Sequence, residues 1–187
     1  MLDWSSIHRA ALPYEEFLKT HASPSMRARW DAIHGRVTLT PGQRSLLGGF
    51  TRGMPVLCLA AGWCGDCMNQ CPILDHFARA AGVVDLRFLE REQRPEVRDE
   101  LAINGGHRLP VVVFLSEDGY EVARRGDRTL SSYRRLAAEQ LGSTCPTGFV
   151  PPGEPALAAS AAEWLDEFER VQLILRLSPR LRELHGD

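Results

Sequence analysis

Two cysteines that follow directly on a short apolar run constrain the fold more than any other feature of the chain. The run Met54–Ala61 is continuous and lies between Gly53 and Gly62, as expected for a strand covered on both faces of a sheet. Cys64 and Cys67 come next, and they open a helical pattern that continues to Ala81. The order of buried strand, Cys-x-x-Cys and helix predicts an α/β fold with sulfur chemistry at the start of a helix.

The position of the two sulfurs suggests a division of labour between them. Unpaired N–H groups and the dipole at a helix N-terminus favour a thiolate over a thiol, so Cys64 is the predicted nucleophile. Cys67 lies one turn further along and is placed to attack a mixed disulfide and release the reduced substrate. The same spacing also fits zinc, so the evidence for redox chemistry comes from the strand before the motif and the helix after it.

The pattern after this helix alternates strands and helices. Predicted strands cover 83–89, 109–115 and 120–124, the last two joined by a short hairpin at Asp118-Gly119, and predicted helices cover 95–103 and 129–141. This order predicts a mixed central sheet flanked by helices.

Three segments are predicted. Residues 1–50 read as a helical N-terminal extension, 51–145 as the α/β domain, and 146–187 as a linker rich in proline and glycine followed by an amphipathic C-terminal helix. That helix buries its apolar stripe either on the chain's own core or against another copy, so a homodimer is possible. The stripe consists of Leu157, Ala161, Trp164, Leu165, Phe168, Val171 and Leu175.

From Met54 to Leu141 the sequence resembles the thioredoxin family, and in particular bacterial thioredoxin-like proteins. Four features carry the likeness: the motif Trp63-Cys64-Gly65-Asp66-Cys67, Pro72 inside the following helix, Leu109-Pro110 at the start of a later strand, and Gly126 after the hairpin. The resemblance implies a thioredoxin fold and a thiol-disulfide oxidoreductase without a cofactor. It also implies a cis Leu109–Pro110 peptide that faces the sulfurs and pairs with an extended substrate. Trp63, Gly65, Asp66, Leu109 and Pro110 would then shape the substrate site.

Several residues depart from the usual pattern of the family. Asp66 replaces the proline of Cys-Gly-Pro-Cys, and a carboxylate beside the thiols should raise their pKa and favour the disulfide, which predicts a reductant. Cys58 occupies the place of a buried acid. Basic residues are also expected around Cys64, so substrate preference cannot be carried over: these are His107, Arg108, Arg124 and Arg125.

A non-catalytic module is the alternative, binding either a metal or a protein partner. Cys71 lies four residues after Cys67 on the same helical face and could join Cys64 and Cys67 around a metal, with Cys58, His76 or Cys145 as a fourth ligand. Otherwise Cys58 and Cys71 are small buried residues, and Cys145 is a free thiol in a loop.

Charge and hydropathy narrow the choice of partners. A net charge of −2 argues against nucleic acid and anionic membranes as partners. The sequence shows neither an apolar run long enough to span a membrane nor a secretory signal, which predicts a cytoplasmic protein. The expected partners are a disulfide-containing protein or low-molecular-weight thiol and an electron donor that the sequence does not identify.

Overall fold

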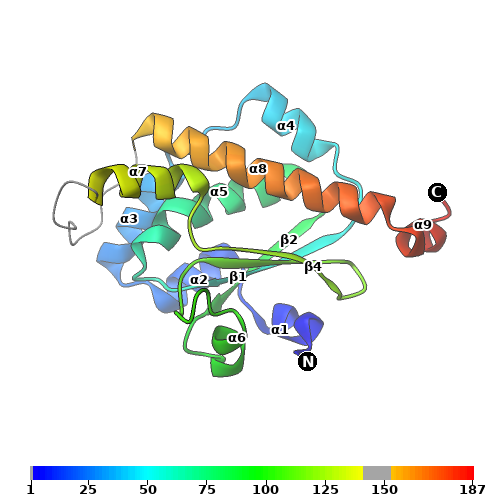
Figure 1. The fold of residues 1–187 in the computed structure, drawn as a ribbon, viewed down its shortest axis with the longest axis horizontal. Coiled ribbons are helices and arrows are strands. Elements are labelled where there is room, and N and C mark those ends of the chain that lie inside the picture. The colour runs from blue at the N-terminus through cyan, green and yellow to red at the C-terminus, as the bar shows by residue number, and fades with distance from the viewer. Residues whose placement is uncertain (1, 141–152) are drawn as a thin grey trace.

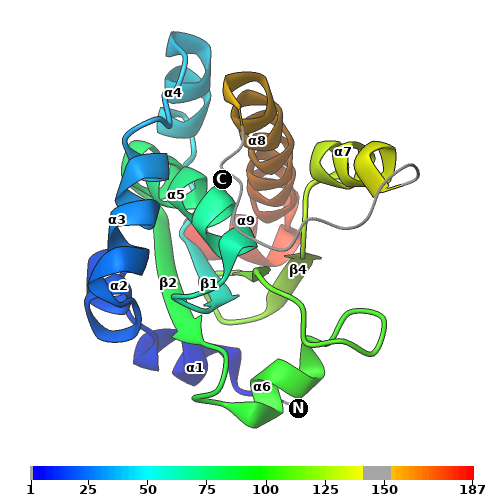
Figure 2. The same ribbon diagram turned by 90° about the vertical axis from the view of Figure 1, so that its left-hand side faces the viewer.

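The computed structural model describes residues 2–140 and 153–187. In chain order the elements are α1 (Trp4–Ala10), α2 (Tyr14–His21), α3 (Pro24–His34), α4 (Pro41–Gly48), β1 (Met54–Ala60), α5 (Gly65–Ala81), β2 (Val84–Glu90), α6 (Pro95–Glu100), β3 (Val111–Leu115), β4 (Glu121–Gly126), α7 (Leu130–Gln140), α8 (Glu154–Leu177) and α9 (Pro179–His185). In Figures 1 and 2, α5 and α8 lie on one side of the sheet and α1 and α6 on the other.

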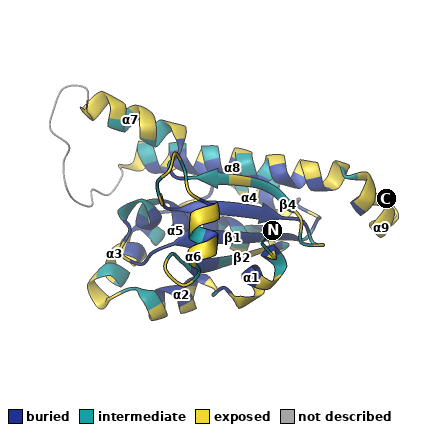
Figure 3. Cartoon of the chain, turned by 60° about the horizontal axis from the view of Figure 1, so that its bottom comes forward, coloured by how far each residue is buried: buried dark blue, intermediate teal, exposed yellow. Residues whose placement is uncertain are grey.

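The four strands form one mixed sheet in the order β2-β1-β3-β4. β1 pairs parallel with β2 and antiparallel with β3, and β3 pairs antiparallel with β4. β1 is therefore a central strand, which explains its continuous apolar sequence. Figure 3 shows β1 coloured as buried, whereas α6 and α7 are coloured largely as exposed or intermediate. The predicted fold class, a mixed sheet flanked by helices, is confirmed.

The helix that carries the motif begins and ends at positions that its sequence sets. Cys64 is the N-cap of α5, and Gly82 ends the helix in the left-handed conformation at φ 69°. Pro72 lies inside α5, where it has no N–H to donate to the carbonyl four residues earlier. The connection from β1 to α5 is short, so the motif lies at the C-terminal end of the central strand β1.

The first fifty residues are helical, as predicted, and they are tied to the sheet. Ser23 and Thr40 are the N-caps of α3 and α4, and their side chains accept backbone hydrogen bonds from Met26 and Gln43. Backbone hydrogen bonds of 2.9 and 2.7 Å join Leu12 to Phe88 on β2. The sequence analysis did not predict α1, which begins after the N-cap Asp3.

The C-terminal helix packs on the chain's own core. All the residues of the predicted stripe are buried, and the Phe168 ring lies edge-on against Phe77 of α5 and Phe114 of β3, with centroids 5.4 and 5.1 Å apart. A homodimer stays a prediction. The short helix α9 was not predicted.

The end of one helix differs from expectation, and part of the predicted linker lies outside the described residues. Helix α6 ends at Glu100 rather than at Ile103, because Ile103 exchanges backbone hydrogen bonds with Gly106 instead. Most of the linker predicted from residue 146, and Cys145, lie outside the described residues. None of the helices that the structure describes is long and apolar enough to cross a membrane.

Candidate active site

Cys64 and Cys67, called here the outer pair, lie at the N-terminal end of α5. The Cys67 N–H donates to Cys64 Sγ over 3.4 Å, and Gly65 is the first residue of the helix. Cys64 keeps 8% of its surface exposed whereas Cys67 is fully buried. The sulfur of Cys64 therefore has the position at the helix start that the sequence predicted for a nucleophile, and Cys67 lies behind it.

The two thiols of the outer pair shift each other's pKa in opposite directions. Hydrogen bonding with Cys67, together with burial, raises the pKa of Cys64. Burial opposes ionisation of Cys67 too, but hydrogen bonds from Cys64, Cys71 and the backbone at Ala61 lower its pKa to about 5. With one proton on the pair, that proton can lie on either sulfur. When it lies on Cys67, the thiolate is on Cys64, where solvent and a substrate can reach it.

Residues of the N-terminal helices hold the loop before the motif. The Trp30 indole N–H donates to the carbonyl of Gly62 over 2.9 Å, and Trp30 is fully buried. A Cβ at position 62 would lie 2.1 Å from the carbonyl oxygen of His21, so only glycine fits there. Sequence analysis missed this role of Trp30 because it links residues far apart in the chain.

Trp63 is exposed beside the nucleophile. More than half of its surface, 54%, is accessible, and the guanidinium of Arg91 lies 5.3 Å from its ring centre. Arg91 follows β2 and donates its backbone N–H to the carbonyl of Ala60 at the end of β1. The aromatic face of Trp63 is thus held at the surface next to Cys64.

The Leu109–Pro110 peptide is cis, which confirms that prediction. In the antiparallel register of β1 and β3, Leu59 lies opposite Val111. Pro110 precedes Val111, so it lies beside the C-terminal end of β1, after which the motif begins. Leu109 is buried. That this peptide faces the sulfurs and binds a substrate strand stays a prediction.

Asp66 is not an isolated charge. Arg128 lies in the connection from β4 to α7. Its Nε donates to the Asp66 carboxylate over 3.0 Å, and its Nη2 lies 2.6 Å from the second oxygen of that carboxylate. The Asp66 charge still raises the pKa of both thiols of the outer pair. The sequence analysis treated this carboxylate as unpaired, and the ion pair offsets part of the effect expected there.

The other basic residues expected near Cys64 have different partners. Arg124 pairs with Glu121 and Glu100, and Arg125 pairs with Glu163. His107 Nε2 lies 3.0 Å from Asp99, and Arg108 lies 3.5 Å from Asp127. Arg128, which no motif singled out, forms the ion pair with Asp66 of the motif.

Cys58 of β1 and Cys71 of α5, called here the inner pair, lie behind the outer pair. Both are fully buried, and their sulfurs are 3.7 Å apart. Burial raises the pKa of each of these thiols. The prediction that both are buried is confirmed. Among the residues that the structure describes, no group of three or more His, Cys, Asp or Glu side chains is arranged to hold a metal ion.

Comparison with known proteins supports the sequence resemblance. A family model described as thioredoxin matches residues 11–132. The chain belongs to the thioredoxin family. The match extends across residue 51, so α2, α3 and α4 fall within it, and the domain boundaries given above stay predictions. A search of curated proteins finds no match.

Solved structures show the same fold at low identity. A protein of unknown function from Pseudomonas aeruginosa matches with a TM-score of 0.71 and 17% identity, over 91% of this chain and 99% of that one. An HIV epitope scaffold matches with a TM-score of 0.63 and 15% identity, over 100% of this chain and 99% of that one. These likenesses extend over the helices outside the central sheet as well.

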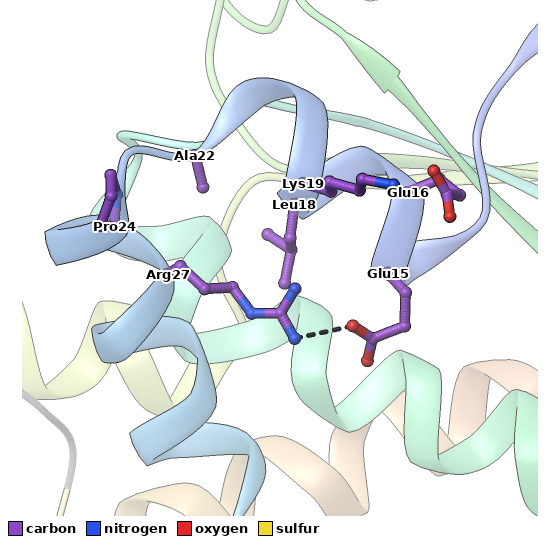
Figure 4. Close-up of a pocket in the computed structure, with 7 residues that line it drawn as sticks. All are labelled: Glu15, Glu16, Leu18, Lys19, Ala22, Pro24 and Arg27. Atoms are coloured by element: carbon purple, nitrogen blue, oxygen red, sulfur yellow. Dashed lines mark hydrogen bonds and ion pairs between the residues drawn. The ribbon is translucent and has the colours of Figure 1, made fainter.

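A surface hollow of about 460 Å³ lies between α2 and α3. An ion pair between Glu15 and Arg27, 2.7 Å apart, spans it in Figure 4. Its lining contains no cysteine, so it supplies no sulfur chemistry.

Proposed function

We propose that this protein is a thiol-disulfide oxidoreductase that uses the dithiol of Cys64 and Cys67. The observation that supports the proposal most strongly is Cys64 at the N-cap of α5, with a backbone N–H aimed at its sulfur and its partner cysteine one turn behind. Membership of the thioredoxin family is consistent with this chemistry.

The reaction proceeds in two exchanges. The Cys64 thiolate attacks one sulfur of the substrate disulfide, so a mixed disulfide forms and the other substrate sulfur leaves as a thiolate. Cys67, after losing its proton, then attacks Cys64 Sγ. This second exchange releases the remaining substrate sulfur, which takes up a proton, and leaves a Cys64–Cys67 disulfide. The substrate has gained two electrons and the outer pair has lost two.

We propose that the protein works as a reductant. The Asp66 carboxylate raises the pKa of both thiols of the outer pair and so disfavours the thiolate of the reduced state. A less stable thiolate makes the disulfide relatively more stable, which moves the reduction potential toward the reducing side. Arg128 weakens this effect through its ion pair with Asp66.

The substrate would be a protein disulfide or a low-molecular-weight disulfide, and a cellular thiol or dithiol would restore the reduced pair. A reducing compartment such as the cytoplasm would suit this cycle. The exposed face of Trp63 beside Cys64 offers an aromatic surface against which an extended substrate could pack.

An insulin reduction assay tests the proposal. With dithiothreitol as the electron donor, the full chain should accelerate the precipitation of reduced insulin chains, measured as turbidity. Cys145→Ser serves as the matched control, because it removes a cysteine outside the outer pair, and it should accelerate the reaction equally. A rate no greater than that of dithiothreitol alone would contradict the proposed function.

A further inference from the structure

The inner pair lies in line with the outer pair. Cys67 and Cys71 are four residues apart, about one turn, on the buried face of α5. Cys71 Sγ in turn lies 3.7 Å from Cys58 Sγ. The Cys67 N–H in turn donates to Cys64 Sγ over 3.4 Å. The four cysteines therefore follow one another from the partly exposed Cys64 to the fully buried inner pair.

From this series we infer that Cys58 and Cys71 form a second, buried dithiol that receives the disulfide from the outer pair by internal exchange. This inference rests on the proposed function, since substrate is what oxidises the outer pair. The inner pair would then store reducing equivalents, so that one chain could reduce a second disulfide before a donor recharges it.

The exchange needs two steps and no further oxidant. The Cys71 thiolate attacks Cys67 Sγ of the Cys64–Cys67 disulfide, which forms a Cys67–Cys71 bond and releases Cys64 as a thiolate that takes up a proton. The Cys58 thiolate then attacks Cys71 Sγ, which forms the Cys58–Cys71 bond and releases Cys67. The outer pair is reduced by two electrons and the inner pair is oxidised by two, so the chain as a whole is unchanged in oxidation state.

The sulfurs must move only a short way to form the Cys58–Cys71 bond and further to form the Cys67–Cys71 bond. Sulfurs in a disulfide are about 2.05 Å apart, so bonding the inner pair closes about 1.6 Å from the observed 3.7 Å. The Cys67–Cys71 bond requires the helical turn to tighten, which makes it a transient intermediate. Pro72 leaves the carbonyl of Met68 without its helical N–H partner, so this turn has one hydrogen bond fewer to oppose the movement.

Burial also sets the speed of the exchange. The attacking species is a thiolate, and both inner thiols lie in the core without exposed surface. Few inner thiolates exist at neutral pH, so the inner bridge should form more slowly than the outer bridge. The inner pair therefore becomes oxidised only after the outer pair, and a turnover can be completed without it.

Site-resolved mapping of the oxidised full chain tests the inference. The reduced protein is incubated with one equivalent of oxidised glutathione, which is enough to form one disulfide per chain, and samples are quenched with acid and alkylated at increasing times. The four cysteines share the tryptic peptide 53–79, but cleavage after Trp63, before Asp66 and after Met68 separates them. We expect the Cys64–Cys67 bridge to appear first and the Cys58–Cys71 bridge to follow after a lag, with the outer thiols reappearing.

Variants separate this inference from the proposed function. Cys67→Ser should prevent the inner bridge, and Cys145→Ser should leave its rate unchanged. Melting curves of the reduced variants check that each is folded. If the outer bridge forms and Cys58 and Cys71 stay thiols, the inference fails and the proposed function stands. An inner bridge that forms at the wild-type rate in Cys67→Ser also overturns the inference. If no outer bridge forms, both fail.

Discussion

The outer and the inner pair consist of the same residue type around one helix, yet their surroundings differ in almost every respect. Cys64 accepts a backbone N–H at the start of α5, and Cys67 next to it has its pKa lowered by hydrogen bonds. Cys71 lies one turn further along α5, and Cys58 lies beside it on β1. Burial raises the pKa of both thiols. Distance from the helix N-terminus thus separates reactive from protected thiols.

The neighbourhoods of the two pairs differ in the same direction. The outer pair has the Asp66–Arg128 ion pair and the exposed Trp63 beside it. The inner pair lies between a central strand and the buried face of α5. Charge and solvent access can tune the outer pair, whereas only packing and contact with neighbouring sulfurs act on the inner one. The following predictions test this contrast.

Removing the nucleophile should have the largest effect. Cys64→Ser replaces a thiol with a hydroxyl that does not ionise near neutral pH, so insulin reduction should fall to the rate with dithiothreitol alone. The turbidity assay measures this loss. Retention of most of the wild-type rate would show that another sulfur attacks the substrate.

Removing the resolving thiol should trap substrates. In Cys67→Ser, Cys64 still attacks, but no sulfur displaces the substrate, so mixed disulfides should accumulate and appear as shifted bands on non-reducing gels. Bands that vanish with dithiothreitol confirm the covalent link. If Cys67→Ser turns over normally while a Cys67→Ser, Cys71→Ala double variant traps substrate, then Cys71 is the resolver and this assignment is wrong.

Removing the arginine at the motif should have a moderate effect. Arg128→Gln leaves the Asp66 carboxylate without its ion pair, so the pKa of the outer thiols should rise and the reduction potential should fall. The expected change in thiol pKa is below about one unit, which is less than about a tenfold change in thiolate population. Equilibration with glutathione buffers measures the potential. Adding Asp66→Asn to Arg128→Gln should reverse the shift, and a potential that rises in Arg128→Gln would contradict the account.

Altering the inner pair should have the smallest effect on steady-state reduction. Cys71→Ala removes a hydrogen bond to Cys67 and a sulfur from the core, a loss of about 1 kcal/mol of stability or somewhat more. With excess dithiothreitol the outer pair cycles without the inner pair, so the rate should change only a few-fold. A loss as large as that of Cys64→Ser would place Cys71 in the catalytic cycle itself.

Local patterns in the sequence predicted the strands, the motif helix and the sheet correctly. β1 could be read because a central strand is apolar throughout, and α5 because its N-cap and its final Gly82 are local signals. The apolar stripe on α8 was predicted from its helical period, but the period does not say what covers it. The structure shows that the chain's own core covers the stripe.

Contacts between distant residues could not be predicted. Trp30 holds Gly62, and Arg128 holds Asp66, across separations that no motif or period encodes. The same limit explains why Cys58 and Cys71 were interpreted either as separate buried residues or as ligands of one metal, and not as a dithiol, since only the packing of α5 on β1 brings their sulfurs together.

The pH dependence of alkylation at each cysteine tests the central claim most directly. The reduced full chain is treated with iodoacetamide at pH values between about 4 and 10, and each site is mapped by mass spectrometry. We predict that Cys64 reacts first, because it alone among the described cysteines keeps exposed surface, and that its rate rises with pH as its thiolate forms. Cys58 and Cys71 should stay unmodified until the protein unfolds. An inner thiol that reacts as fast as Cys64 would contradict the account.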